Sequence, residues 1–95
     1  MKMHNPPPPR EIIFEDYLKP LNIGVEELAD SLDLSVQTVS EMLEGDRAID
    51  ADMAYRLGLA TKTTAESWLD MQQAYDLWQI EQNGNYTKVR ELAMA

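Results

Sequence analysis

The sequence contains no cysteine, which excludes a disulfide framework and a thiolate metal site. Its single histidine, His4, lies in a proline-rich arm, and no glycine-rich phosphate loop is present, so we expect no metal, no cofactor, no small-molecule substrate and no enzymatic activity. No apolar run approaches the length of a membrane span, and the N-terminus lacks the basic-then-apolar order of a secretion signal. These absences predict a soluble, cytoplasmic protein that does not contact a membrane.

Basic residues are also scarce. The chain has 17 acidic residues against eight lysines and arginines, a net charge of −9. Between Pro20 and Lys62 the sequence has nine acidic and three basic residues, a local net charge of 3 − 9 = −6. Proteins that bind nucleic acids usually present a basic face, because neutralising phosphates supplies much of their affinity. A DNA-binding domain with this composition must therefore place its few cations on the DNA side.

The apolar residues that are present recur at helical spacing, and no alternating strand pattern occurs. We predict an all-α protein with five helices in a single domain of this 95-residue chain. The predicted parts are a proline-rich arm at residues 1–9, a helix-turn-helix domain with a long C-terminal helix at residues 10–82, and a short tail at residues 83–95. Pro20 is expected to end the first helix at Leu18, and Thr63 to Glu66 is expected to open the last helix as a capping box.

Two amphipathic helices meet across a tight turn near the middle of the chain. Their apolar stripes are separated by only three residues, a spacing typical of a helix-turn-helix motif; the stripes are Val25, Leu28, Ala29 and Leu32, then Val36, Val39 and Leu43. Asp33 is suited to a left-handed turn, and Ser35 is suited to cap the second helix. In DNA-binding proteins with this motif, the start of the second helix enters the major groove.

The residues expected to face DNA lie at the start of that second helix and in the loop after it: Ser35, Val36, Gln37, Thr38, Glu41 and Arg47. Gln37 can form two hydrogen bonds with the edge of an adenine, or can be a solvated polar residue. Val36 can touch a thymine methyl group, although we favour a place for it in the core stripe. Arg47 is the best candidate for a phosphate contact, the alternative being a surface ion pair with Asp46 or Asp50.

The remaining candidates are uncharged or acidic. Ser35 and Thr38 can donate to phosphates and so position the protein on DNA, while Ser35 is equally suited to be only a helix cap. Glu41 can accept from a cytosine amine, but without a donor it would repel the DNA backbone.

The long C-terminal helix carries a broad aromatic and apolar seam. Trp68, Met71, Tyr75 and Trp78 recur at i, i+3, i+7 and i+10. We expect this helix to bury part of the seam in its own core and part against a second copy of the chain, the alternative being a role in the core alone. A two-fold dimer through this helix would place two recognition helices roughly 34 Å apart, one turn of DNA.

Several segments together resemble HigA-type antitoxins, the virulence-associated protein I group of the phage-repressor-like (Xre) helix-turn-helix family. The most specific segment is SWLDMQQAYDLW at residues 67–78; the others are LKPL at 18–21, GDRAI at 45–49 and MAYRL at 53–57. The resemblance implies a phage-repressor-like fold and an antitoxin that neutralises a HigB-like toxin, a small ribonuclease that cuts messenger RNA. It also implies a homodimer that binds palindromic, double-stranded operator DNA and represses its own operon.

The sequence departs from the family pattern at three places, one of which is Gly24-Val25, where the family's motif helix often opens with serine and glutamine. Pro8-Pro9-Arg10 stands where the family has histidine-proline-glycine, and residues 36–41 contain no cation where relatives commonly carry arginines. Two alternatives therefore stay open: a protein-interaction module that has lost DNA binding, and a stand-alone repressor without a toxin. In the antitoxin interpretation, the acidic surface would meet a basic toxin, since charge complementarity speeds and selects encounter.

Overall fold

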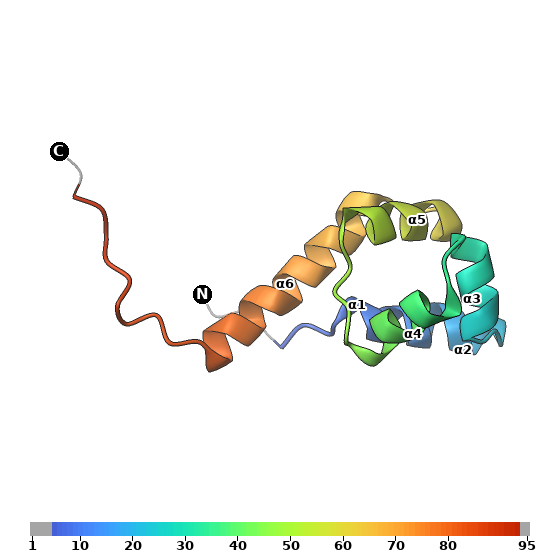
Figure 1. The fold of residues 1–95 in the computed structure, drawn as a ribbon, viewed down its shortest axis with the longest axis horizontal. Coiled ribbons are helices and arrows are strands. Elements are labelled where there is room, and N and C mark those ends of the chain that lie inside the picture. Colours follow the sequence, from blue (N-terminus) through green and yellow to red (C-terminus); the bar gives the residue numbers. More distant parts are fainter. Residues whose placement is uncertain (1–4, 94–95) are drawn as a thin grey trace.

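The computed structural model describes residues 5–93, and this part of the chain contains only helices and loops (Figure 1). Three short elements run on without a break as the first helix: α1 (Pro9–Ile13), a π-helical turn η1 (Phe14–Leu18) and α2 (Lys19–Leu21). Four more helices follow: α3 (Val25–Leu32), α4 (Val36–Glu44), α5 (Ala51–Thr61) and α6 (Ala65–Asn83). The prediction of an all-α, five-helix fold is confirmed.

The prediction that Pro20 ends the first helix at Leu18 is wrong. Lys19, which precedes the proline, keeps helical dihedral angles, and the helix ends at Leu21, where Asn22 turns left-handed with φ of 56°. A proline removes one backbone donor and crowds the preceding turn of an α-helix. Here the π-helical turn ends at Leu18, two residues before Pro20, and an irregular turn of this kind is a known way to accommodate an interrupted hydrogen-bond ladder.

The helix-turn-helix motif has the predicted turn and cap. Asp33 is left-handed, with φ of 56°, and its neighbour Leu34 donates its backbone N–H to the carbonyl of Ala29 at 3.0 Å. Ser35 caps α4, its hydroxyl accepting from the backbone N–H of Thr38 at 3.0 Å. Because the turn and the cap are both satisfied locally, the start of α4 is fixed relative to α3.

The boundary between α5 and α6 differs from the prediction by one residue. Thr64, not Thr63, is the N-cap of α6 and accepts from the backbone N–H of Ser67 at 3.1 Å. The hydroxyl of Thr63 instead accepts from the indole N–H of Trp68 at 2.8 Å. The helices approach closely here, since a Cβ on Gly58 would lie 2.9 Å from the backbone nitrogen of Ala65.

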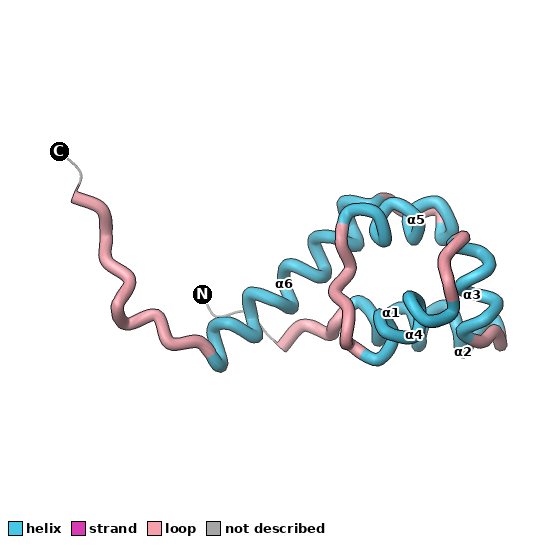
Figure 2. The backbone as a smooth tube through the Cα atoms, in the orientation of Figure 1, coloured by secondary structure: helices cyan, strands magenta, loops and turns pink. Residues whose placement is uncertain are grey.

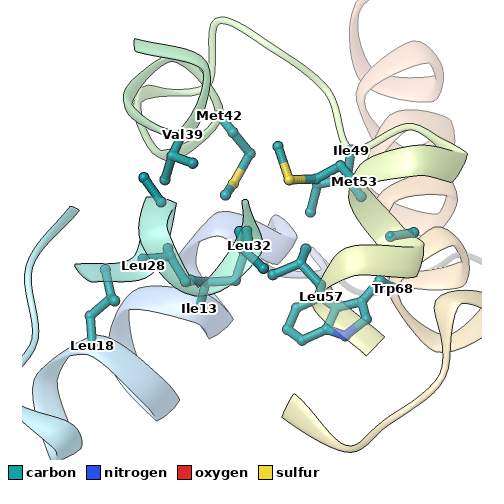
Figure 3. Close-up of a cluster of buried hydrophobic side chains, with 12 residues drawn as sticks. Ile13, Leu18, Leu28, Leu32, Val39, Met42, Ile49, Met53, Leu57 and Trp68 are labelled. Carbon is teal, nitrogen blue, oxygen red and sulfur yellow. The ribbon is translucent and has the colours of Figure 1, made fainter. Parts of the chain in front are cut away.

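One hydrophobic core joins all five helices (Figure 3). It contains Ile13, Leu18, Leu28, Ala29, Leu32, Val39, Met42, Ile49, Met53, Ala54, Leu57 and Trp68. The start of α6 packs against α5, whereas its second half extends away from the other helices toward the tail (Figures 1 and 2). Residues 84–93 are an exposed loop without a helix. No helix among the described residues is long and apolar enough to cross a membrane.

Candidate nucleic-acid interface

The first turn of α4 presents its side chains to solvent. Ser35, Val36 and Gln37 are exposed, and Thr38 is half-buried. We favoured a core position for Val36 from the sequence, but its side chain is 43% exposed, so that interpretation is wrong. The buried residues of α4 are Val39 and Met42, and Val36, at the first helical position, lies beyond the edge of this packed stripe.

The two hydroxyl residues of this turn bond to each other. The Ser35 hydroxyl donates to the Thr38 hydroxyl at 2.8 Å, in addition to capping the backbone N–H of Thr38. Both side chains therefore have a structural role without DNA. Their proposed phosphate contacts stay a prediction, one that is compatible with their exposure.

Glu41 lies between the two polar side chains that were expected to contact DNA. Its Oε1 accepts from Arg47 Nη2 at 2.8 Å and from Arg47 Nε at 3.2 Å, and its Oε2 accepts from Gln37 Nε2 at 3.4 Å. The ion pair that we considered for Arg47 from the sequence involved Asp46 or Asp50, but the partner is Glu41. The hydrogen bonds from Arg47, and secondarily from Gln37, lower the pKa of Glu41 below its ordinary value.

Three side chains from two segments thus form one polar group at the exposed face of α4, which we call the Gln37–Glu41–Arg47 triad. Gln37 and Glu41 are one helical turn apart, and Gly45, left-handed with φ of 87°, reverses the chain so that Arg47 returns to Glu41. Exposed ion pairs contribute little to stability because water screens them and two long side chains lose freedom. The pair can therefore be exchanged for another partner at low cost.

Two contacts that hold this face in place were missed from the sequence. Arg56 of α5 pairs with Asp52 at 2.8 Å and also donates to the carbonyl oxygens of Leu32 at 2.9 Å and Asp33 at 3.1 Å. It thereby ties the turn of the motif to α5. No local pattern announces these bonds, because they join residues more than twenty positions apart.

The loop that carries Arg47 is held by α6. Gln72 Oε1 accepts from the backbone N–H of Ile49 at 2.9 Å, and the side chain of Ile49 is buried. Gln72 lies in the family-like segment 67–78, which was the only sequence signal for a role of this residue.

The predicted seam of α6 divides into a buried part and a part that faces outward. Trp68 is 1% exposed and belongs to the chain's own core, so it has no surface to offer a second subunit. Met71, Tyr75 and Trp78 are half-buried. Near the end of the helix Leu77 is 48% and Ile80 44% exposed, although neither was among the candidates.

No group of three or more histidine, cysteine or carboxylate side chains capable of holding a metal ion occurs within the described residues. His4, for which metal binding was considered improbable, lies outside the described residues.

Comparison with known proteins finds a helix-turn-helix family model that matches residues 14–68, more than half of the chain. Virulence-associated protein I of Dichelobacter nodosus is 43% identical over 75 residues, which cover 79% of this chain and 69% of that protein. The solved structure of antitoxin GraA in complex with its operator has a TM-score of 0.85 at 32% identity, covering 99% of this chain and 98% of that one.

A second solved structure, the Pseudomonas aeruginosa antitoxin HigA with the higBA promoter, has a TM-score of 0.81 at 33% identity. The match covers 93% of this chain and 99% of that one. These matches confirm the resemblance to HigA-type antitoxins and virulence-associated protein I that the sequence predicted. The names of these relatives describe antitoxins and a virulence-associated protein, not enzymes.

Proposed function

This chain belongs to the helix-turn-helix family, and on that premise we propose that it is a DNA-binding antitoxin. In this proposal a homodimer binds double-stranded operator DNA and represses its own operon, and the same protein neutralises a HigB-like, mRNA-cleaving toxin. The observation that carries the DNA-binding part is the exposed first turn of α4, followed by the Gln37–Glu41–Arg47 triad. The relatives GraA and HigA, both solved with their operator or promoter DNA, support it.

DNA binding by this face divides between base edges and phosphates. In this proposal Gln37 forms two hydrogen bonds with an adenine, which discriminates against a wrong base by roughly 1–3 kcal/mol. Val36, whose side chain is 43% exposed, touches a thymine methyl group. Ser35 and Thr38 donate to phosphates, which positions the protein without specifying a sequence. Arg47 exchanges the Glu41 carboxylate for a phosphate of the DNA backbone.

The proposed dimer uses the outer side of α6. Met71, Tyr75 and Trp78 give it partly buried apolar surface, and Leu77 and Ile80 continue that surface toward the helix end. Apolar side chains of this size are stabilised by burial, and a second copy of the chain supplies a matching surface by symmetry. The dimer sets two copies of α4 roughly 34 Å apart, so that each reads one half-site.

The net charge of −9 fits the second part of the proposal better than the first. A basic toxin would be attracted to this acidic protein over several ångströms, which raises the rate of association and selects the partner. Among the described residues most acids lie outside the triad, so toxin and DNA need not compete for the same side chains.

The test is a fluorescence-anisotropy titration of the protein against its own upstream DNA at low and moderate salt, with Arg47→Ala and the matched control Arg90→Ala. Arg90 is an exposed cation in the loop after α6, so its removal changes the net charge equally. We expect specific binding that weakens with salt and that only Arg47→Ala reduces. Wild-type protein that binds neither its upstream DNA nor an unrelated duplex would contradict the proposal.

A second candidate function is a protein-interaction module that has lost DNA binding. The local balance of −6 around the motif, the lack of a cation in residues 36–41 and the engagement of Arg47 by Glu41 favour it. This module would bind the toxin encoded beside it and no DNA. A stand-alone repressor would show the opposite pattern, with operator binding and no neutralisation of a toxin.

A further inference from the structure

A second arginine, Arg10, lies beside the loop that follows α4. Its guanidinium carbon is 5.8 Å from the centroid of the Tyr75 ring on α6. A Cβ placed on Gly45 would lie only 3.0 Å from the same carbon. The N-terminal turn of the first helix thus holds a cation between α6 and the loop that leads to Arg47.

Arg10 differs from the other two arginines of the helical domain, Arg47 and Arg56. The ion pairs found among the described residues join Lys19 with Glu15, Arg47 with Glu41 and Arg56 with Asp52, and none includes Arg10. A cation over an aromatic face is held by the ring quadrupole but keeps its N–H donors for other acceptors. Arg10 is therefore able to bind an anion without first giving up a carboxylate.

Arg10 and Arg47 line the same hollow, which has a volume of about 130 Å³. This is room for more than one water molecule. Gln72 and Asp76 also line it, but Gln72 is bonded to the backbone N–H of Ile49 and donates to Asp76 Oδ1 at 2.9 Å. The hollow is therefore lined by two arginines, of which Arg47 is bonded to Glu41 in the free protein, and by one carboxylate, Asp76, that already accepts a hydrogen bond.

We propose that Arg10 and Arg47 together bind one phosphate of the DNA backbone at this hollow. The inference rests on the proposed function and deepens it, since it adds a sequence-independent contact from the start of the first helix. Guanidinium groups bind phosphate oxygens through paired N–H donors, and Arg10 is already held in place by Tyr75 and Gly45. Arg10 compensates in part for the absence of cations in the first turns of α4.

The experiment measures the affinity of Arg10→Gln for the upstream DNA and for an unrelated duplex of equal length, from 50 to 200 mM salt. Glutamine keeps most of the side-chain length and removes the charge. One lost phosphate contact lowers the slope of log K against log salt by about 0.9, so the variant's affinity falls about 3.5-fold less over this range than the wild type's. We expect weaker binding of both duplexes, because a phosphate contact carries no sequence information.

Two controls separate this effect from unfolding and from net charge. The Tm and helical circular dichroism of Arg10→Gln show whether the domain is folded, and Arg10→Lys is expected to restore part of the salt slope. Lys19→Gln removes a cation that is paired with Glu15 on the same continuous helix, and is expected to leave the slope unchanged.

The outcomes distinguish a failure of the proposed function from a failure of the proposed phosphate contact. Wild-type protein that binds neither duplex would overturn the proposed function together with this inference. Wild-type binding with an unchanged slope in folded Arg10→Gln, or an equal loss in Lys19→Gln, would overturn the inference alone. If inorganic phosphate without DNA raises the Tm of the wild type but not of Arg10→Gln, while the two proteins have the same salt slope for DNA, the hollow binds free phosphate, and its assignment to the DNA backbone is wrong.

Discussion

The first turn of α4 and the second half of α6 both expose side chains to solvent, but they differ in whether the exposed groups have bonding partners within the chain. At α4 the polar side chains bond to one another, as Ser35 does with Thr38 and Glu41 does with Gln37 and Arg47. On α6 the exposed residues Leu77 and Ile80 are apolar and have no such partner available to them. Large apolar side chains gain free energy only when another surface covers them.

The difference indicates which kind of partner each surface suits. The polar groups of α4 are hydrogen-bonded to one another in the free protein, and in the proposed complex they would exchange these partners for DNA, so that hydrogen bonds replace hydrogen bonds. The apolar end of α6 is exposed in the free chain, and in the proposed homodimer a second copy would remove it from water. DNA binding at α4 should thus respond strongly to salt, whereas association through α6 should respond weakly.

The largest effect is expected near the start of α6, in the half of the helix that packs against α5. Trp68→Ala should destabilise the fold by about 3–5 kcal/mol, because a buried aromatic ring leaves a cavity and the Thr63 hydroxyl loses its donor. Urea unfolding followed by circular dichroism measures this change. Trp78→Ala is the matched control and should cost far less at protein concentrations where the chain is monomeric; equal losses would mean that both tryptophans belong to the core.

The next effect concerns the apolar end of α6. Ile80→Asp should weaken dimerisation by about 10- to 100-fold, since burying such a side chain is worth roughly 1.5–3 kcal/mol and a charge in its place is disfavoured. Sedimentation at several protein concentrations measures the dissociation constant. Lys88→Asp changes charge in the exposed loop nearby and should leave it unaltered. A dimer that survives Ile80→Asp would place the subunit contact elsewhere.

The parts of the fold that depend on a few adjacent residues are predictable from the sequence alone. The helix caps at Ser35 and Asp50 and the left-handed turns at Asp33 and Gly45 were predictable, because each depends on a few adjacent residues. Rules based on adjacent residues fail where the sequence is compatible with two local structures. Pro20 is kept in a helix by a π-helical turn that has no sequence signature.

The capping residue shows the same failure at the level of hydrogen bonds. Thr63 and Thr64 both have a plausible capping pattern, and the choice is made by a tertiary hydrogen bond from Trp68 to Thr63. The candidate site divides in a similar way. Gln37 and Glu41 lie one helical turn apart, so their contact can be predicted from the sequence. Arg47 has three acidic residues within reach along the chain, Glu41, Asp46 and Asp50, and only the path of the loop at Gly45 brings it to Glu41. The approach of Arg10 to Gly45 spans 35 positions and has no local pattern at all.

At α4, the exchange of partners can be tested by removing the competing carboxylate. Glu41→Gln should strengthen binding to the upstream DNA by about two- to fivefold, the range expected when an exposed ion pair no longer competes for Arg47. Anisotropy titrations at one salt concentration measure the change, and Glu44→Gln on the same helix is the matched control, because Glu44 is exposed and not among the ion pairs found. A loss of affinity restricted to duplexes with a particular cytosine would show instead that Glu41 reads that base.

The smallest expected effect is the response of the same triad to pH. Hydrogen bonds from Arg47 and Gln37 lower the pKa of Glu41 in the folded protein relative to the unfolded chain. A carboxyl group with a lowered folded-state pKa stabilises the fold above its unfolded-state pKa, and this contribution is lost as the pH falls through the folded-state value. Acid therefore weakens the triad slightly and frees Arg47 at the same time. An NMR titration of the Glu41 carboxyl carbon should give a pKa below the ordinary range for glutamate, and Arg47→Ala should move it back toward that range. If Arg47→Ala leaves this pKa unchanged, Arg47 is not held by Glu41 in solution. The polar side chains of α4 would then not be bonded to one another, and the contrast with the apolar end of α6 would not hold.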